Sequence, residues 1–221
     1  MDILFVCTGN TCRSNMAEAL FRDILEKDSR ARHLDIKIHS AGTGAVEGLS
    51  SAPLAVEVLK EREIDLSSHR TKALFPDMVE RADLIFTMSK RHKDEVLRMA
   101  PRAKDKVFIL KEFTSLKDLM KAALNSSVEV GGDLSRKVKE LKRIHGDTRE
   151  RFEEIEEEMG ALRESLPQSL KEKGERFFRP SEDPFRFDIA DPVGKDIQAY
   201  RKCVEELESE LLKLAELLMG A

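Results

Sequence analysis

The residues of this chain that could do chemistry stand close together near its N-terminus. In order they are Cys7-Thr8-Gly9-Asn10-Thr11-Cys12-Arg13-Ser14. A short apolar run precedes the first cysteine, and a helical pattern of apolar residues follows the serine. A strand that delivers a cysteine, a short loop, and a helix that begins at an arginine predict a covalent phosphate-transfer site built around a sulfur nucleophile.

The residue types at these positions suit that chemistry. Loop amides and a helix N-terminus would favour negative charge on the Cys7 sulfur and on a bound phosphoryl group. The planar guanidinium of Arg13 could hold two phosphoryl oxygens at once. Gly9 would permit a tight backbone and the close approach of a substrate. Asn10 could brace the loop through its amide, and the Ser14 hydroxyl could cap the helix and donate to the sulfur.

A cysteine and an arginine at this spacing also occur by chance. Cys7 could be a small buried hydrophobic residue at the end of a strand, and Arg13 could be a solvated surface charge. The preceding strand, the following helix, Gly9 inside the loop and Ser14 after the arginine favour a phosphate or oxyanion site. It is not a nucleotide-binding P-loop, because no Gly-Lys-Ser/Thr sequence follows.

A site of this kind also needs an acid that protonates the leaving group. Asp191 is a candidate, because Pro192 and Gly194 indicate a loop ahead of a long amphipathic helix. The proline would hold Asp191 extended, with its carboxylate projecting. Asp188 is a competing candidate, and an ordinary role in a turn is an equally good explanation of Asp191.

Several separated strings together resemble the low-molecular-weight protein tyrosine phosphatase family. Besides residues 7–14 they are Met16-Ala17-Glu18, Ser40-Ala41-Gly42-Thr43, Ser68-His69-Arg70, Ala82-Asp83-Leu84-Ile85-Phe86-Thr87-Met88, Lys111-Glu112-Phe113 and Asp191-Pro192. The resemblance covers residues 1–113 and 186–219. It implies a cysteine-dependent phosphatase that acts on phosphorylated proteins, passes through a phosphocysteine intermediate resolved by water, and needs no metal or other cofactor.

The resemblance also implies the roles of the site residues. These are Cys7 as nucleophile, Arg13 as phosphate clamp, Asp191 as general acid, Ser14 as partner of the sulfur, Asn10 as brace, and Thr8, Gly9, Thr11 and Cys12 as the rest of the phosphate-binding loop. Family members can close a cysteine pair of this spacing reversibly. Oxidation of Cys7 to a sulfenic acid could therefore be trapped as a Cys7–Cys12 disulfide, although Cys12 could also be a plain loop or core thiol.

Thr11 and Val193 bear on the choice of substrate. Tyrosine-specific members usually carry a bulkier aliphatic residue at the position of Thr11, whereas bacterial protein-arginine phosphatases carry threonine. A threonine hydroxyl can meet a guanidinium or order a water, and such a hydrogen bond can discriminate strongly between substrates. Val193 stands where the family usually has an aromatic residue, and valine offers a phenyl ring no stacking face.

We therefore predict a phosphoarginine phosphatase. A tyrosine phosphatase is the first alternative, and a phosphoprotein-binding or coiled-coil adaptor on the same fold is the second. An arsenate reductase of this fold would need resolving cysteines after the third strand, and residues 89–110 contain none.

The composition limits the remaining possibilities. The formal net charge of -4, without a basic tail, argues against nucleic acid as a partner. No run of about eighteen apolar residues and no signal peptide is found, so neither a membrane span nor secretion is expected. Three cysteines without a disulfide framework suit the cytoplasm, and five scattered histidines predict no metal site.

Strands predicted at 2–7, 34–39, 83–87 and 106–110 alternate with helices predicted at 14–28, from 53, from 89 and at 195–218. This alternation predicts an α/β fold with a parallel sheet flanked by helices, and the resemblance implies the strand order 2-1-3-4. The phosphatase domain would comprise residues 1–114 and 185–221.

Residues 115–184 would form an inserted helical arm. Apolar residues between 134 and 166 recur at alternating steps of four and three, which is typical of a coiled coil or helical hairpin. The arm could simply pack on itself or on the domain, or it could mediate a dimer or bind a protein partner. Its position ahead of Asp191 suggests the hypothesis that engagement of the arm alters how that carboxylate is presented.

Overall fold

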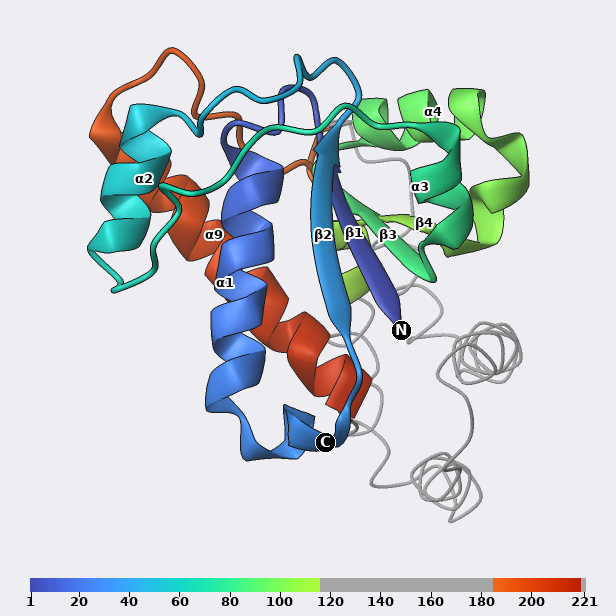
Figure 1. The fold of residues 1–221 in the computed structure, drawn as a ribbon, viewed down its shortest axis with the longest axis horizontal. Coiled ribbons are helices and arrows are strands. Elements are labelled where there is room, and N and C mark those ends of the chain that lie inside the picture. The colour runs from blue at the N-terminus through green and yellow to red at the C-terminus, as the bar shows by residue number, and fades with distance from the viewer. Residues whose placement is uncertain (116–184, 220–221) are drawn as a thin grey trace, which may run out of the picture. The chain divides into compact units, whose positions relative to one another are not determined.

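The computed structural model describes residues 1–115 and 185–219 (Figure 1). The segments Met1–Thr114 and Phe187 onward belong to one compact unit. The helical arm predicted for residues 115–184, together with its proposed role as a dimer or partner contact, lies outside the described residues except at its first position.

A four-stranded parallel sheet forms the centre of this unit (Figure 1). Its strands are β1 (Asp2–Cys7), β2 (Lys37–Gly42), β3 (Leu84–Thr87) and β4 (Val107–Ile109). Their order is β2-β1-β3-β4, which confirms the predicted topology. Because β1 lies between β2 and β3, the loop that follows Cys7 emerges at the carboxyl edge where the strand order reverses. Ligands of open α/β sheets bind at such an edge.

Helices cover both faces of the sheet. They are α1 (Arg13–Lys27), α2 (Pro53–Lys60), α3 (Pro76–Arg81), α4 (Lys90–Met99) and α9 (Ile197–Met219), with 3-10 turns at Ser29–His33 and Pro101–Lys106. α9 packs against α1 and α2 on one side, and α3 and α4 lie on the other (Figure 1). The segment that bears Asp191 leads into α9, so the packing of this helix on α1 and α2 anchors the acid candidate.

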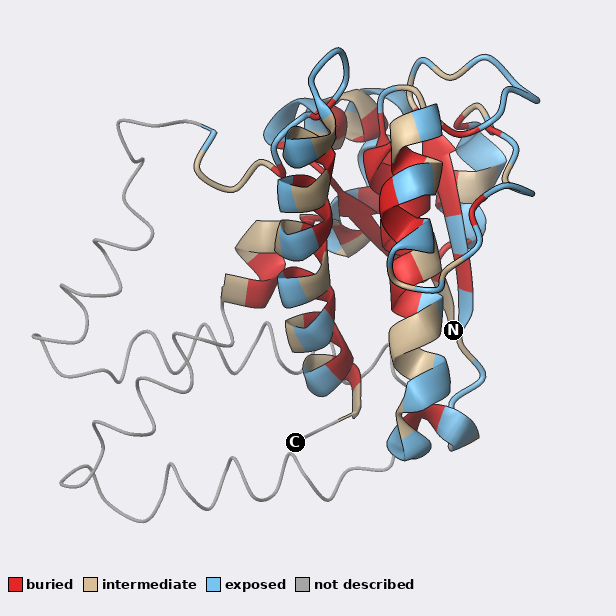
Figure 2. Ribbon diagram, turned by 90° about the vertical axis from the view of Figure 1, so that its left-hand side faces the viewer, coloured by how far each residue is buried: buried red, intermediate tan, exposed pale blue. Residues whose placement is uncertain are grey.

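The alternation of side chains along β1 divides the core between the two faces. Leu4 and Val6 pack with Val79 and Val96 beneath α3 and α4. On the other face, the ring of Phe5 meets that of Phe21 on α1, with 5.8 Å between centroids. Figure 2 shows the buried residues gathered on the sheet and on the inner sides of the helices. Both faces of β1 are therefore buried, which holds the strand that ends at the nucleophile candidate in place.

The second strand begins and ends three residues later than predicted. It begins at Lys37, which pairs with Asp2, and it continues through Gly42, opposite Cys7. The apolar Leu34 precedes the strand and is 40% exposed. The strand's last three residues carry small side chains because the phosphate loop lies against them, and this departs from the usual composition of a strand. α3 was not predicted at all, since six residues are too short to display a helical period.

The other elements fall within a few residues of their predicted ends. On α9, residues at helical spacing are buried, while Ile197 is only partly covered; the buried residues are Tyr200, Val204, Leu207, Leu211, Leu214 and Leu218. Cys203 is also buried on this helix. In the part of the chain that the structure describes, no helix is both long and apolar enough to cross a bilayer.

Candidate active site

The loop between β1 and α1 brings the predicted site residues together. Cys7 is the last residue of β1 and is 3% exposed, and Arg13 is the first residue of α1. The five residues between them turn the chain from the sheet into the helix. A sulfur at the end of a strand and a guanidinium at the start of a helix thus flank one short loop.

The Cys7 sulfur is surrounded by hydrogen-bond donors. The backbone amide of Asn10 donates to it across 3.3 Å, and the Ser14 hydroxyl lies 3.0 Å away. The same hydroxyl lies 3.3 Å from the Ala41 carbonyl, so its single proton is shared between two acceptors. If the sulfur is negatively charged, the Ser14 hydroxyl should donate to the sulfur and not to the carbonyl, because hydrogen bonds to an ionised acceptor are stronger than those to a neutral one.

Asn10 holds the loop through both ends of its side chain. Its amide nitrogen donates to Ser14 Oγ across 3.0 Å and to Ser40 Oγ across 2.8 Å, and its amide oxygen accepts from the Lys72 backbone across 2.8 Å. Its φ of 54° lies in the left-handed region, which asparagine tolerates better than most residues. Its backbone oxygen contacts His69 Nε2 at 3.0 Å. The structure therefore places Asn10 as a brace at the centre of the loop.

The loop also offers a set of unpaired backbone donors. Cys12, at the N-cap position of α1, gives the helix no side-chain cap. Across residues 1–115 and 185–219, no acceptor receives the backbone amides of Thr8, Gly9, Thr11, Cys12, Arg13 and Ser14. Unpaired amides at a helix N-terminus favour an anion, because their dipoles point toward it.

Arg13 links the loop to the segment before α9. Its Nη1 donates to the Ile189 carbonyl across 3.2 Å, and its Nη2 forms an ion pair with Asp191 Oδ2 at 2.5 Å. The arginine side chain is 8% exposed and that of Asp191 is 47% exposed, so the carboxylate lies at the solvent side of the pair. The second oxygen of Asp191 accepts from the Val193 amide across 3.1 Å.

The two acid candidates lie in different surroundings. Asp188 Oδ1 accepts from the backbone amide of Lys90, the first residue of α4, across 2.9 Å. Asp191, in contrast, reaches the arginine of the loop. The geometry therefore favours Asp191 over Asp188 as the carboxylate of the site.

The remaining predicted residues occupy different depths of the site. Thr11 is half-buried, and its carbonyl accepts from Ala52 across 2.9 Å. A Cβ added to Gly9 would lie 3.4 Å from Thr11 Oγ1, so the threonine hydroxyl lies over the loop glycine. Val193 is 60% exposed at the edge of the site.

Cys12 is buried beneath the loop, where its sulfur lies 3.4 Å from the hydroxyl of Tyr200 on α9. Burial raises the pKa of the Cys12 thiol and also that of the tyrosine. Tyr200 is itself 4% exposed, so it does not supply an aromatic face at the mouth in place of Val193.

Three features of the site were not predicted from the sequence. A Cβ at Gly42 would lie 2.4 Å from the Thr8 carbonyl oxygen, so only glycine fits beside the loop. Ser40, which receives the Asn10 amide, donates to Glu18 across 2.5 Å. Thr8 contacts His92 of α4. The string Ser40-Ala41-Gly42-Thr43 did mark this neighbourhood, but no local pattern indicated His92.

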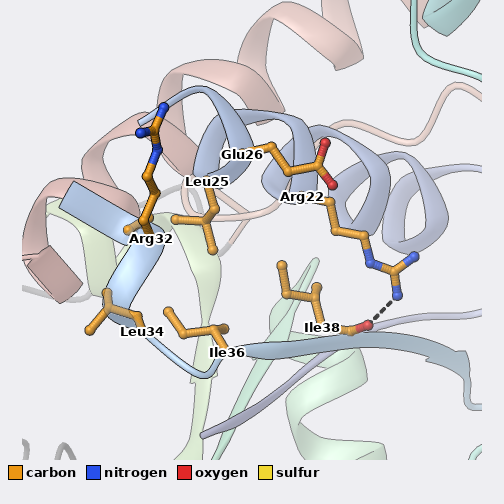
Figure 3. Close-up of a pocket in the computed structure, with 8 residues that line it drawn as sticks. Arg22, Leu25, Glu26, Arg32, Leu34, Ile36 and Ile38 are labelled. Carbon is orange, nitrogen blue, oxygen red and sulfur yellow. Dashed lines mark hydrogen bonds between the residues drawn. The ribbon is translucent and has the colours of Figure 1, made fainter. Parts of the chain in front are cut away.

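A surface pocket lies away from these residues, between the later turns of α1 and the start of β2 (Figure 3). Its lining residues are Arg22, Leu25, Glu26, Ala31, Arg32, Leu34, Ile36 and Ile38. None of the predicted site residues is among them, so the candidate site is defined by the loop and not by this pocket. Among the residues that the structure describes, no group of three or more His, Cys, Asp and Glu side chains is arranged to hold a metal ion.

Comparison with known proteins places these features in context. The family model described as low molecular weight phosphotyrosine protein phosphatase matches residues 2–176. A protein-arginine-phosphatase of Bacillus subtilis is 44% identical over 115 residues, which span 52% of this chain and 73% of that protein. The low molecular weight protein-tyrosine-phosphatase Wzb of Escherichia coli is 36% identical over 108 residues, or 49% of this chain and 68% of Wzb.

Solved structures agree with the sequence relatives. A YwlE mutant from Bacillus subtilis has a TM-score of 0.62 at 30% identity, covering 99% of this chain and 98% of its own. A second structure is the YwlE arginine phosphatase as a C7S mutant with a phosphorylated active site serine. It has a TM-score of 0.64 at 30% identity and covers 100% of this chain and 97% of its own.

Proposed function

Because this chain belongs to the low molecular weight phosphotyrosine protein phosphatase family, and is therefore a protein phosphatase, we propose that it hydrolyses phosphoarginine in proteins. Cys7 is the nucleophile, Arg13 the phosphate clamp and Asp191 the general acid. The observation that carries the assignment of roles is the single cluster in which the Cys7 sulfur faces amide and hydroxyl donors while Arg13 reaches Asp191.

In the first step, the Cys7 sulfur attacks the phosphorus atom of the substrate. The S–P bond forms as the bond from phosphorus to the guanidine nitrogen breaks, and the Asp191 carboxyl gives its proton to that nitrogen. Arg13 and the unpaired loop amides hold the phosphoryl oxygens throughout. They are fixed before the substrate arrives, so they stabilise the transition state without reorganising.

In the second step, water resolves the phosphocysteine. The Asp191 carboxylate accepts a proton from the water as its oxygen attacks phosphorus, and the S–P bond breaks toward the sulfur. Inorganic phosphate leaves, and the sulfur recovers its negative charge. The Ser14 hydroxyl, 3.0 Å from the sulfur, stabilises that charge as it returns.

The preference for phosphoarginine rests on Thr11. Its hydroxyl lies near Gly9 and 3.6 Å from the Cys12 sulfur, and it could accept from a guanidinium N–H or order a water. Two further observations support the proposal. One relative is a protein-arginine-phosphatase, and a solved arginine phosphatase carries phosphate on an active site serine, as expected if the residue at that position takes up the phosphoryl group.

A phosphotyrosine phosphatase is the second candidate, favoured by the similarity to Wzb. The exposed Val193 weighs against it, because a phenyl ring would find no stacking partner at this position, although the same valine also removes a contact expected of arginine phosphatases. An adaptor without turnover, the second alternative named above, would have no need of an arginine and an aspartate arranged around the cysteine.

The test is kcat/KM on matched phosphoarginine and phosphotyrosine peptides. We expect wild type to prefer phosphoarginine and Thr11→Ile to lose at least about tenfold of that preference, since the aliphatic side chain cannot hydrogen-bond. Cys7→Ser, the matched control, should turn over neither peptide. If wild type preferred phosphotyrosine, the protein would be assigned as a phosphotyrosine phosphatase. If it turned over neither peptide, the adaptor would be favoured.

A further inference from the structure

A line of polar side chains leads from the start of α4 into the phosphate loop. The imidazole of His92 lies 2.8 Å from Thr8 Oγ1 through Nε2 and 2.8 Å from Ser89 Oγ through Nδ1. The ring is buried, with 2% of the residue exposed. Thr8 directly follows Cys7, so this line ends beside the proposed nucleophile. The mechanism above assigns no part to the side chains of these three residues.

The positions of the protons follow from the partners. Ser89 Oγ caps α4 by accepting from the His92 backbone amide across 3.3 Å. The cap leaves the serine's own proton for Nδ1, 2.8 Å away, and a serine that donates there leaves Nδ1 unprotonated. Burial, and to a lesser extent the charge of Arg13, lower the pKa of His92 to about 4. The ring is therefore neutral at neutral pH. A neutral ring with a bare Nδ1 carries its proton on Nε2 and donates it to Thr8.

This assignment fixes the hydroxyl of Thr8. Its oxygen accepts from His92, so its own proton must point away from the imidazole. Inside the two described segments the hydroxyl has no partner other than His92. The proton is therefore available to a group bound at the loop, as a further donor beside the backbone amides.

The main chain of Thr8 is held as well. Its carbonyl accepts from the Gly44 amide across 2.9 Å. A peptide unit is planar and trans, so the N–H of Gly9 points opposite to that carbonyl and away from Gly44. Gly9 N–H is one of the unpaired loop amides. Two contacts, one on the side chain and one on the backbone, thus determine where two donors of the loop are aimed.

We propose that His92 is a positioning residue for phosphoryl transfer. In its Nε2–H form it holds Thr8 so that the threonine hydroxyl and the Gly9 amide are directed at the phosphoryl oxygens bound above Cys7. The inference rests on the proposed function only in requiring that the loop binds a phosphoryl group. It does not depend on whether that group comes from arginine or tyrosine.

The experiment compares five variants, one of them a control, with wild type, using p-nitrophenyl phosphate as substrate and vanadate as the probe of oxyanion binding. His92→Phe fills the space without donating, and Thr8→Val keeps the shape of Thr8 without its hydroxyl. Each should lower kcat and the affinity for vanadate by about tenfold, since each misaligns donors of the loop. Their double mutant should lose no more than either alone, because both break one contact.

The conservative variant His92→Gln retains a side-chain N–H that can reach Thr8, and it should recover most of the kcat lost in His92→Phe. The matched control is His39→Gln, the same substitution at an exposed histidine of β2, which should leave kcat and vanadate affinity unchanged. Thermal unfolding of each variant shows whether the fold is kept.

Nitrogen NMR of wild type with labelled histidine tests the proton assignment without any substitution. We expect His92 to show a protonated Nε2 and an unprotonated Nδ1. The reverse pattern would overturn the proposal, and so would a folded His92→Phe or Thr8→Val with unchanged kcat and vanadate affinity. If vanadate did not bind wild type at all, both the proposed function and this inference would be wrong. If wild type and the variants bound vanadate equally well, only the role of His92 would be wrong.

Discussion

At the scale of single residues, Asn10 and Cys12 give the phosphate loop its shape from opposite sides. Asn10 ties the loop to β2 and α1 through its amide, while Cys12 anchors its underside against Tyr200. Burial raises the pKa of the Cys12 thiol, so it remains a thiol at neutral pH and is spared direct attack by peroxide. To resolve a sulfenic acid at Cys7, Cys12 would have to give up its proton as it attacks.

We accordingly predict that Cys12 protects Cys7 from irreversible oxidation. Peroxide would convert Cys7 to a sulfenic acid, and the Cys12 thiol would then displace water from it to form the Cys7–Cys12 disulfide. After peroxide treatment, dithiothreitol should restore most activity to wild type and clearly less to Cys12→Ala.

Cys203→Ala is the control for this experiment, because Cys203 is also buried but lies on α9 outside the loop. After peroxide and dithiothreitol, Cys203→Ala should regain as much activity as wild type. Equal recovery of Cys12→Ala and wild type would remove the protective role, and mass spectrometry of the oxidised protein would show whether the disulfide forms.

At the scale of elements, α9 joins the two parts of the chain that the insertion separates. Glu206 on this helix forms an ion pair with Lys111 at 2.5 Å through Oε1 and accepts from the Ala190 amide across 3.2 Å through Oε2. Lys111 lies just before the insertion, and Ala190 directly precedes Asp191. One carboxylate therefore fixes both the start of the insertion and the segment that presents the proposed acid.

Glu206→Ala should loosen the backbone ahead of Asp191 and lower kcat. The loss of one charge-assisted hydrogen bond of about 1.5 kcal/mol corresponds to roughly tenfold. Because the defect would lie in proton donation, it should be larger for phenyl phosphate, a poor leaving group, than for p-nitrophenyl phosphate.

Glu208→Ala on the same helix is the matched control, since Glu208 pairs with Arg62 at 3.4 Å and does not touch the acid segment. It should behave like wild type. An equal effect of Glu206→Ala on both substrates would mean that the residue does not act through Asp191.

At the scale of the whole molecule, the sequence predicted the loop residues and the parallel sheet because both depend on short, contiguous patterns. It misplaced β2, whose small residues are chosen by contact with Asn10 and Ser14 and not by strand propensity. It missed His92, because the contact with Thr8 spans 84 positions and leaves no local signal. Side chains on other helices and strands support the loop, and local sequence patterns could not identify them.

The insertion can be tested at this scale, and its role stays a prediction. Lys111 and Ala190 meet at Glu206, so the chain on either side of the insertion comes together there. Replacing residues 116–184 by a short glycine-serine linker should therefore preserve the folded unit. If engagement of the arm alters the presentation of Asp191, the deletion should change kcat on p-nitrophenyl phosphate or on a phosphorylated protein. Unchanged turnover of both substrates would dismiss that role.

The contact between Tyr200 and Cys12 has an optical consequence. The chain contains one tyrosine and no tryptophan, so its intrinsic fluorescence above the phenylalanine range arises from a single ring. The hydroxyl of that ring lies 3.4 Å from the sulfur beneath the phosphate loop. Disulfides quench nearby phenols, so the emission of the unlabelled protein should dim as Cys12 is oxidised and brighten on reduction. The fold thus carries its own spectroscopic reporter of the redox state of the loop.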